Sequence, residues 1–228
     1  MREHPLLFKG AMVQALLARR KTQTRRVVTW HNSTLDGARV GHRGRRRERW
    51  DSLDWGRAVV DPGGSIFGAC PYFKVPSLLE PGDETWHRIC SIHQPGDFLW
   101  VKETWAPRAD NPGLTHYRAS PPPVPPGKWR PAIHMPRQRS RISLEVNRAA
   151  AQWLWDISEE DAIAEGVEQL PSGLYRNYLA DMHFEFARTS FASLWDAVNG
   201  PRGLGWQTNR PVWAIAFQIP TAGHHHGA

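Results

Sequence analysis

The stretch Arg19-Arg20-Lys21-Thr22-Gln23-Thr24-Arg25-Arg26 places five cations and two hydroxyls at the junction of two different sequence patterns. Before it, residues 8–20 carry apolar side chains at helical spacing and end in basic residues, which are favourable at a helix C-terminus. After it, residues 22–30 are rich in β-branched side chains, which favour a strand. The sequence therefore predicts a helix, a tight turn and a strand around this basic stretch.

The rest of the chain adds strands and two helices to this unit. Alternating apolar residues predict three further strands, at 97–105, 141–146 and 212–219. Ser158, followed by three acidic residues, predicts the start of a short helix that ends at Gly166. Residues 178–198 predict a longer, aromatic-rich helix. These elements place the protein in the α+β class.

The region between the first strand and residue 95 has a different composition. It is rich in Gly, Pro, Arg and Trp, it includes an arginine-rich run at 43–49, and it has no sustained periodicity. We interpret residues 31–95 as a long irregular insertion in a single domain that spans residues 1–220. Residues 221–228 are expected to form a disordered tail.

Bulk composition limits the class of protein. A chain of 228 residues can bury one substantial core, and no apolar run reaches the roughly 18 residues that a membrane span needs. Two cysteines and a start without a leader pattern predict a soluble cytoplasmic protein with no membrane partner. The 29 basic against 22 acidic residues predict a nucleoside, a nucleotide or a nucleic acid as partner, although a basic charge can also serve solubility alone.

The basic stretch suits two kinds of chemistry. Hydroxyls beside cations fit a phosphate-binding surface. They also fit a nucleophile whose proton is taken by a lysine, because neighbouring cations lower the pKa of that lysine. The alternative is a basic turn that faces water.

Six motifs carry a resemblance to a known family. They are, in order, Lys-Thr-Gln-Thr-Arg-Arg (21–26), Pro-Gly-Asp-Phe-Leu-Trp-Val-Lys-Glu-Thr-Trp (95–105), Trp-Arg-Pro-Ala-Ile-His-Met-Pro (129–136), Ser-Arg-Ile-Ser-Leu-Glu-Val (140–146), Asp-Ile-Ser-Glu-Glu-Asp-Ala-Ile-Ala-Glu-Gly-Val (156–167) and Phe-Ala-Ser-Leu-Trp-Asp (191–196). In order and spacing the chain resembles the ASCH-domain proteins, a PUA-like family, in the form encoded by tailed bacteriophages and prophages. The resemblance covers most of the chain outside residues 31–90.

This resemblance implies a fold and two classes of activity. The fold is a small β-barrel of mixed strands flanked by helices, with a ligand cleft between the first helix–strand junction and the later helix. Members with assigned activities are amidohydrolases that act on N(4)-acylated cytidines, or proteins that bind or cleave RNA. The amidohydrolases use a lysine and a threonine of a Lys-Thr-x-Thr turn and a glutamate of the later helix, which correspond here to Lys21, Thr24 and Glu165.

Under this resemblance the expected chemistry is acyl transfer without a cofactor or a metal. Thr24 would attack the amide carbonyl, and Lys21 would take its proton and later protonate the leaving amine. Glu165 would orient the lysine or bind the base. The structural alternatives are a strand hydroxyl for Thr24 and a helix-surface carboxylate for Glu165.

Substrate contacts are expected from cations and aromatic side chains, because rings stack on bases while Arg and His bind polar edges or phosphates. The predicted substrate-binding residues are Thr22, Arg26, Trp105, Tyr117, Arg118, His134 and Arg141, and core packing is the alternative for Trp105 and Met135. The alternative function is an RNA- or modified-base-binding module, in which the run at 43–49 holds RNA or single-stranded nucleic acid. Some family members of this kind also cleave RNA. The sequence gives no oligomeric state.

A zinc site is a further hypothesis. Cys70, His87, Cys90 and His93 offer four ligands of the type that zinc prefers. Their spacing lacks the paired Cys-x-x-Cys arrangement typical of structural zinc sites. We therefore predict no metal site.

Overall fold

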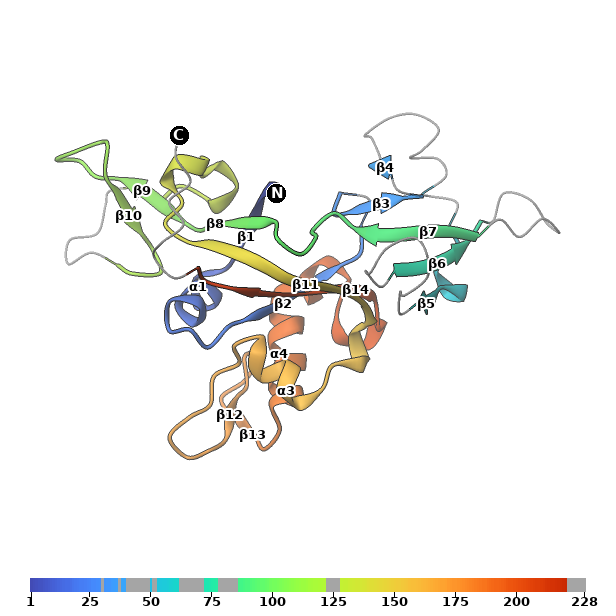
Figure 1. The fold of residues 1–228 in the computed structure, drawn as a ribbon. Helices are drawn as coiled ribbons and strands as arrows, with labels where there is room; N and C mark the ends of the chain where they lie inside the picture. The colour runs from blue at the N-terminus through green and yellow to red at the C-terminus, as the bar shows by residue number, and fades with distance from the viewer. Residues whose placement is uncertain are drawn as a thin grey trace.

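The computed structural model describes residues 1–29, 31–36, 38–39, 50, 53–61, 72–77, 86–121 and 128–220. These residues form an α+β fold dominated by two five-stranded sheets (Figure 1). The arginine-rich run at 43–49 and the tail at 221–228 lie outside the described residues. No helix in the described ranges is long and apolar enough to cross a membrane.

The first sheet has the strand order β1-β8-β11-β14-β2. The bounds of these strands are Glu3–Leu7, Phe98–Lys102, Ser143–Trp153, Pro211–Gln218 and Gln23–Val27. Strand β1 pairs with β8 in parallel and every other pairing in this sheet is antiparallel, so the strands are mixed, as expected. The register of β11 against β14 shifts between Val146 and Arg148, a β-bulge.

The first sheet is open, so the expected closed barrel is wrong for the part of the chain that the structure describes. Strands β1 and β2 are its two edges. At this gap the Arg26 guanidinium donates a hydrogen bond to the carbonyl of Leu7 (2.7 Å) and lies 4.9 Å from the centre of the Phe8 ring. Side chains, rather than backbone pairing, therefore join the two edges.

The second sheet has the strand order β4-β3-β7-β6-β5. Its strands are Ala38–Arg39, Ser33–Leu35, Trp86–Ser91, Tyr72–Pro76 and Val59–Asp61. The expectation of an irregular insertion is wrong for these residues. Each strand has only two to six residues, which is too short for a sustained alternation to stand out in the sequence.

An aromatic cluster attaches the second sheet to the first. The ring of Phe73 lies 5.6 Å from that of Trp213 and 5.9 Å from that of Trp153, measured between ring centroids. Trp213 is fully buried, and its indole N–H donates a hydrogen bond to the hydroxyl of Ser33 (2.9 Å). Residues of both sheets therefore belong to one hydrophobic core.

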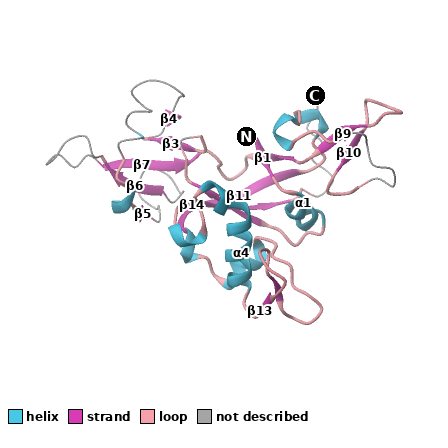
Figure 2. Cartoon of the chain, turned by 180° about the vertical axis from the view of Figure 1, so that it is seen from behind, coloured by secondary structure: helices cyan, strands magenta, loops and turns pink. Residues whose placement is uncertain are grey.

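The described residues include three α-helices, and the last two of them in the sequence lie together on one face of the first sheet (Figures 1 and 2). Their bounds are Gly10–Leu17 for α1, Glu159–Ala164 for α3 and Ala187–Asn199 for α4. Helix α3 begins as predicted, since the Ser158 hydroxyl accepts a hydrogen bond from the Asp161 backbone. Helices α3 and α4 share a second hydrophobic cluster with β14.

Two predicted boundaries are wrong. Helix α4 starts nine residues later than predicted, because residues 175–184 contain a small ribbon of β12 (Tyr175–Arg176) and β13 (His183–Phe184). Strand β11 continues seven residues beyond the predicted end, through three consecutive alanines. Alanine favours helices, but pairing with the buried strand β14 overrides that propensity.

The remaining strands form a hairpin of β9 (Trp105–Pro107) and β10 (Thr115–Tyr117). This hairpin and the second sheet lie at opposite ends of the molecule (Figures 1 and 2). The segment after β10 contacts α1, where Gln14 donates a hydrogen bond to the carbonyl of Ala119 (3.3 Å). The predicted strands at 22–30, 97–105 and 212–219 are confirmed as β2, β8 with the start of β9, and β14.

Candidate active site

The basic turn folds back onto the end of helix α1. Arg19 adopts a left-handed backbone conformation (φ 55°), which ends the helix. The backbone N–H groups of Arg20 and Lys21 then both donate to the carbonyl of Ala15, at 2.9 and 3.2 Å. These contacts fix the direction in which the lysine leaves the turn.

The basic turn also binds the C-terminal end of helix α3. Thr22 donates its backbone N–H (2.8 Å), Lys21 its ammonium (2.7 Å) and Arg20 its guanidinium (3.2 Å) to carbonyl oxygens of residues 164–166. Carbonyls at a helix end have no partner within the helix, and cations there are favourable. Lys21 is therefore part of a packed junction, whereas Arg19, Arg20 and Thr22 lie on the exposed side of the turn.

A buried carboxylate connects these elements. The two carboxylate oxygens of Glu165 are divided between Lys21, whose Nζ lies 2.7 Å from Oε2, and Arg25, whose Nη1 lies 3.3 Å from Oε1. Arg25 also contacts the carboxylate of Asp161 at 2.5 Å. Lys21 is 1% exposed, and Arg25 and Glu165 are each 4% exposed. Burying such charges is costly unless they are closely paired, as they are here.

The environment of Lys21 changes its proton affinity. Burial lowers the pKa of its ammonium from 10.5, and the neighbouring carboxylate of Glu165 opposes this shift. The charges of Arg26 and Arg25 lower the pKa further. The lysine expected from the sequence is thus present, but burial contributes more to its lowered pKa than the crowding of cations does.

Gly166 allows the end of helix α3 to lie against the lysine. Its backbone has a φ of +84°, which favours glycine. A Cβ atom at this position would lie 2.8 Å from the Cβ of Lys21 and 3.0 Å from that of Ala15. A glycine directly after Glu165 is therefore needed for the two elements to pack this closely.

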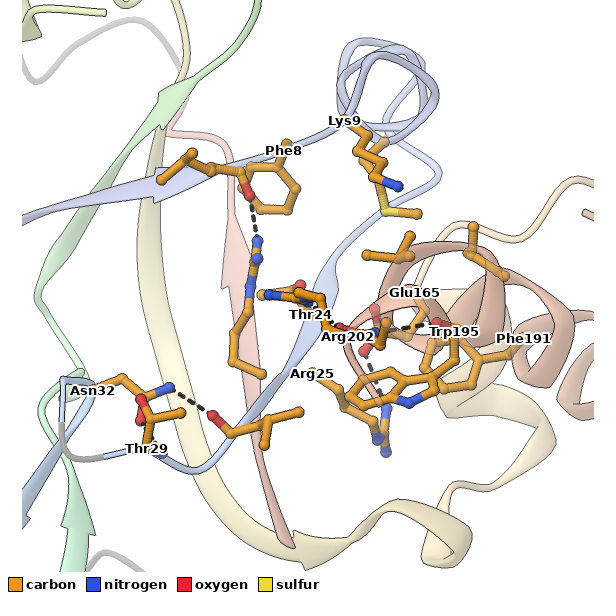
Figure 3. A pocket seen from close by; sticks show the side chains of 17 residues that line it. Phe8, Lys9, Thr24, Arg25, Thr29, Asn32, Glu165, Phe191, Trp195 and Arg202 are labelled. Atoms are coloured by element: carbon orange, nitrogen blue, oxygen red, sulfur yellow. Dashed lines mark hydrogen bonds and ion pairs between the residues drawn. The ribbon is translucent and has the colours of Figure 1, made fainter. Parts of the chain in front are cut away.

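A cavity of about 270 Å³ lies beside the ion pair (Figure 3). Thr24, which is 4% exposed, and Glu165 both line it. Lys21 does not line the cavity, but its ammonium donates a hydrogen bond to the carboxylate of Glu165, which does. The full lining is Leu7, Phe8, Lys9, Met12, Thr24, Arg25, Arg26, Val27, Thr29, Asn32, Glu165, Phe191, Leu194, Trp195, Val198, Asn199 and Arg202.

The cavity occupies the gap between the two edges of the first sheet. Strand β2 and the end of β1 supply one part of its wall, and helix α4 supplies another (Figure 3). The helix contributes the rings of Phe191 and Trp195, and the turn after it contributes Arg202. The sequence shows residues 191–196 as a motif but does not indicate what they bind. No sequence feature marks Arg202 as a site residue, because only folding brings it near β2.

Six of the predicted substrate-binding residues lie away from this cavity. Arg26 lines it, whereas Thr22 is exposed and does not. The other five, which belong to β9, β10 and the segments after them, also do not line it: Trp105, Tyr117, Arg118, His134 and Arg141. Of these, Arg118 and His134 are exposed, and Trp105 is 4% exposed, with Arg130 and Arg139 stacked over its ring. Trp105 therefore fits the alternative of core packing, as does Met135, which is 2% exposed.

Arginines near the hairpin make internal contacts. Arg141 forms a two-pronged ion pair with Glu103 (2.8 and 3.0 Å) and lies 4.0 Å from the centre of the Tyr117 ring. The Tyr117 hydroxyl donates to the carbonyl of Arg139 (3.0 Å). Arg139 in turn donates to carbonyls of residues 112–114 in the hairpin loop. These contacts fit a structural role for Tyr117 and Arg141.

Of the residues of the zinc hypothesis, His87, Cys90 and His93 lie in the described ranges, and there they form no group that could hold a metal ion. His87 and Cys90 lie three positions apart in β7 and therefore face opposite sides of the strand. The Nδ1 atom of His87 lies 2.9 Å from the carboxylate of Asp36, and Cys70 is outside the described residues. Among the ranges that the structure describes, no group of three His, Cys, Asp or Glu residues could hold a metal ion.

Comparisons of the chain with protein-family models, with curated proteins and with solved structures find no match. The resemblance to ASCH-domain proteins therefore rests on the six sequence motifs. The geometry adds that three of these motifs, at 21–26, 156–167 and 191–196, meet at one cavity.

Proposed function

We propose that this protein is an amidohydrolase of PUA-like (ASCH) fold that removes acyl groups from N(4)-acylated cytosine nucleosides. One observation carries the proposal: Thr24 and Glu165 line one cavity, and Lys21 is buried against Glu165. These are the residue types of the amidohydrolase members, at the matching motif positions. The mixed sheet flanked by helices is compatible with the proposed fold.

The first half of the reaction is acyl transfer to the enzyme. The Thr24 hydroxyl attacks the carbonyl carbon of the acyl group, and its proton passes to the Lys21–Glu165 pair. The bond between this carbon and the exocyclic nitrogen then breaks. The nitrogen leaves as the amino group of cytosine, with a proton supplied by the same pair, and the acyl group remains on Thr24 as an ester.

The second half restores the threonine. A water molecule attacks the ester, gives up a proton to the Lys21–Glu165 pair, and releases the acyl group as a carboxylic acid. The hydroxyl of Thr24 regains its proton from the pair. A lysine whose pKa is lowered by burial suits this cycle, because a larger fraction of it is neutral near physiological pH and can accept a proton.

The aromatic wall of the cavity fits a pyrimidine. Phe191 and Trp195 face the same cavity as Thr24 (Figure 3). A flat aromatic base gains stacking and apolar contact against such rings. The base would lie along helix α4 with its acylated nitrogen directed toward β2.

The test is hydrolysis of a panel of N(4)-acetyl and N(4)-benzoyl cytidines and deoxycytidines, followed by the absorbance change as the acyl group is lost and cytidine or deoxycytidine forms. Wild-type protein is expected to turn over at least one member, and Lys21→Ala, Thr24→Ala and Glu165→Ala are expected to lose turnover while circular dichroism shows an intact fold. Full activity in these variants would place the site elsewhere, and no turnover of any member would contradict the proposal.

The alternative of an RNA- or modified-base-binding, and RNA-cleaving, module stays a prediction. The arginine-rich run at 43–49, on which it mainly depends, lies outside the described residues. Near the hairpin, Arg139 and Arg141 are engaged in internal contacts. This reading predicts affinity for single-stranded RNA that falls steeply with salt and weakens when residues 41–50 are deleted. Salt-insensitive or absent binding would contradict it.

A further inference from the structure

The cavity carries more positive charge than the proposed chemistry uses. Four cations line it, namely Lys9, Arg25, Arg26 and Arg202, against the single carboxylate of Glu165. That carboxylate is already paired with Arg25 and with Lys21 behind it. Among the residues that the structure describes, no carboxylate lies within ion-pair distance of Lys9, Arg26 or Arg202. The cavity is therefore suited to a ligand with negative charge.

Arg26 has one buried donor that the protein does not satisfy. One of its terminal nitrogens donates to the carbonyl of Leu7 at 2.7 Å, and its ring-stacked position over Phe8 holds the guanidinium in place. Its Nε atom is buried and has no hydrogen-bond partner. A buried donor without an acceptor is unfavourable, so an acceptor supplied by a ligand would be favourable here.

Arg202 brings a second guanidinium to the same wall. It follows helix α4 and donates a hydrogen bond to the side-chain oxygen of Asn199, another lining residue. Burial lowers the pKa of Arg26 to about 10; Glu165 opposes this shift and the charge of Arg202 adds to it. The Arg26 guanidinium therefore keeps its charge at neutral pH, and it lies close enough to Arg202 for the two side chains to repel each other, which an anion between them would relieve.

We propose that Arg26 and Arg202 bind the phosphate of a cytosine nucleotide, so that the preferred substrate is a nucleotide and not a neutral nucleoside. Phosphate oxygens match the planar donors of arginine, and two guanidiniums can share one phosphate group. The phosphate can belong to a free mononucleotide or to a nucleic-acid chain, since both present the same oxygens. The identity of the base rests on the proposed function, whereas the phosphate site does not.

The test is a calorimetric titration with cytidine 5′-monophosphate and with cytidine, which carry no acyl group and so are not consumed. Wild-type protein is expected to bind the monophosphate at least tenfold more tightly than cytidine. Arg202→Gln is expected to bring this ratio close to one while the affinity for cytidine stays unchanged. The control is Arg148→Gln, an exposed arginine of β11 outside the cavity, which is expected to keep the wild-type ratio.

Two results would overturn the phosphate site: equal affinity of wild-type protein for both ligands, or a ratio that Arg202→Gln leaves unchanged. A short oligocytidylate in the same titration identifies the source of the phosphate. Tighter binding of the oligomer, lost in Arg202→Gln, indicates a chain, and a preference for the monophosphate indicates a free nucleotide. A phosphate preference without any hydrolysis would reject the proposed reaction and leave this site standing, so the two claims fail separately.

Discussion

Glu165 and Glu103 are buried carboxylates of the described residues that are held by cations, and they have different surroundings. Glu165 is 4% exposed and is bound by Lys21 and Arg25, while Glu103 is 2% exposed and is bound by both prongs of Arg141. Glu165 opens onto a cavity that also holds a threonine hydroxyl. Glu103 does not line that cavity, and the arginine that binds it is stacked on Tyr117.

The comparison shows that two similarly buried ion pairs can differ in whether they border a cavity. Both pairs connect elements that are distant in the sequence: Glu165 joins helix α3 to the basic turn, and Glu103 joins the end of β8 to the segment before β11. What distinguishes Glu165 is the open space beside it, a threonine that lines the same cavity and a lysine with a lowered pKa.

The largest expected effect comes from removing the charge of Lys21. Lys21→Met is expected to lower kcat/KM for the acylated substrate by about 10³-fold, since proton transfer by a positioned side chain contributes about 10²- to 10⁴-fold. At the other pair, Arg141→Lys keeps the charge but loses the two-pronged geometry; it is expected to lower the melting temperature and leave kcat/KM within about threefold, because it touches no cavity residue. Steady-state kinetics and thermal melts measure both.

The opposite pattern would break the comparison. If Arg141→Lys abolished turnover while Lys21→Met kept it, the reacting site would lie at the hairpin and the cavity beside Glu165 would be incidental.

A smaller effect is expected at the glycine beside the lysine. Gly166→Ala introduces strain at positive φ and pushes on Lys21, which together are expected to cost about 2 to 4 kcal/mol of stability and about 10- to 100-fold in turnover. Gly173 also has a positive φ (+85°), but nothing lies within 4 Å of its missing Cβ. Gly173→Ala is therefore expected to cost only about 1 kcal/mol and to leave turnover unchanged. Equal turnover in the two variants would show that the position of Lys21 is unimportant.

The pH dependence of turnover is expected to follow Lys21. Neutral lysine accepts the proton, so kcat/KM rises with pH through the pKa of Lys21, which burial places below 10.5. Glu165 raises that pKa, so the residual turnover of Glu165→Gln is expected to rise at lower pH than in wild-type protein. The exposed carboxylate Glu168, changed to Gln, serves as the control that leaves the profile in place. If kcat/KM of Glu165→Gln rose at the same pH as in wild-type protein, or at a higher pH, Lys21 would not be the group that controls the pH dependence.

The same pKa shift has a consequence for stability. Between the folded pKa of Lys21 and 10.5, the unfolded chain binds the proton more tightly than the folded protein does. The contribution of Lys21 to the free energy of unfolding is therefore expected to increase as pH rises through this window, which denaturant titrations at several pH values can measure.

The smallest effect is expected at the hairpin. Tyr117→Phe removes one hydrogen bond, from the phenol to the carbonyl of Arg139, and is expected to cost about 0.5 to 1.5 kcal/mol without changing turnover. Urea denaturation measures the loss. A drop in turnover larger than about threefold would indicate that the hairpin contacts the substrate, as predicted from the sequence.

The sequence predicted the parts of the site that depend on local signals. The basic turn lies between a helix and a strand, and Ser158 caps the helix that ends near Glu165, because periodicity and capping act over a few neighbouring residues. Whether Thr24 and Glu165 act in catalysis stays a prediction. Their presence at one cavity is a finding of the structure.

The sequence did not predict which distant side chains share the cavity. Trp105 and Tyr117 were expected there because aromatic and basic residues suit a nucleotide, yet composition does not determine which way a side chain points. Arg202 and Trp195 reach the cavity only because folding brings α4 and the turn after it opposite β2, a segment at least 160 residues earlier in the chain. The strands of 31–95 were missed because each is too short to show its alternation.

The proposed function requires the Thr24 hydroxyl to react at this cavity, and a comparison of Thr24→Ser with Thr24→Val tests this requirement. Serine keeps the hydroxyl and valine keeps the shape, so loss of packing is separated from loss of the nucleophile. In release of cytidine from N(4)-acetylcytidine or its 5′-monophosphate, Thr24→Ser is expected to retain measurable turnover and Thr24→Val to fall to background. Turnover by Thr24→Val at the wild-type rate would contradict the account.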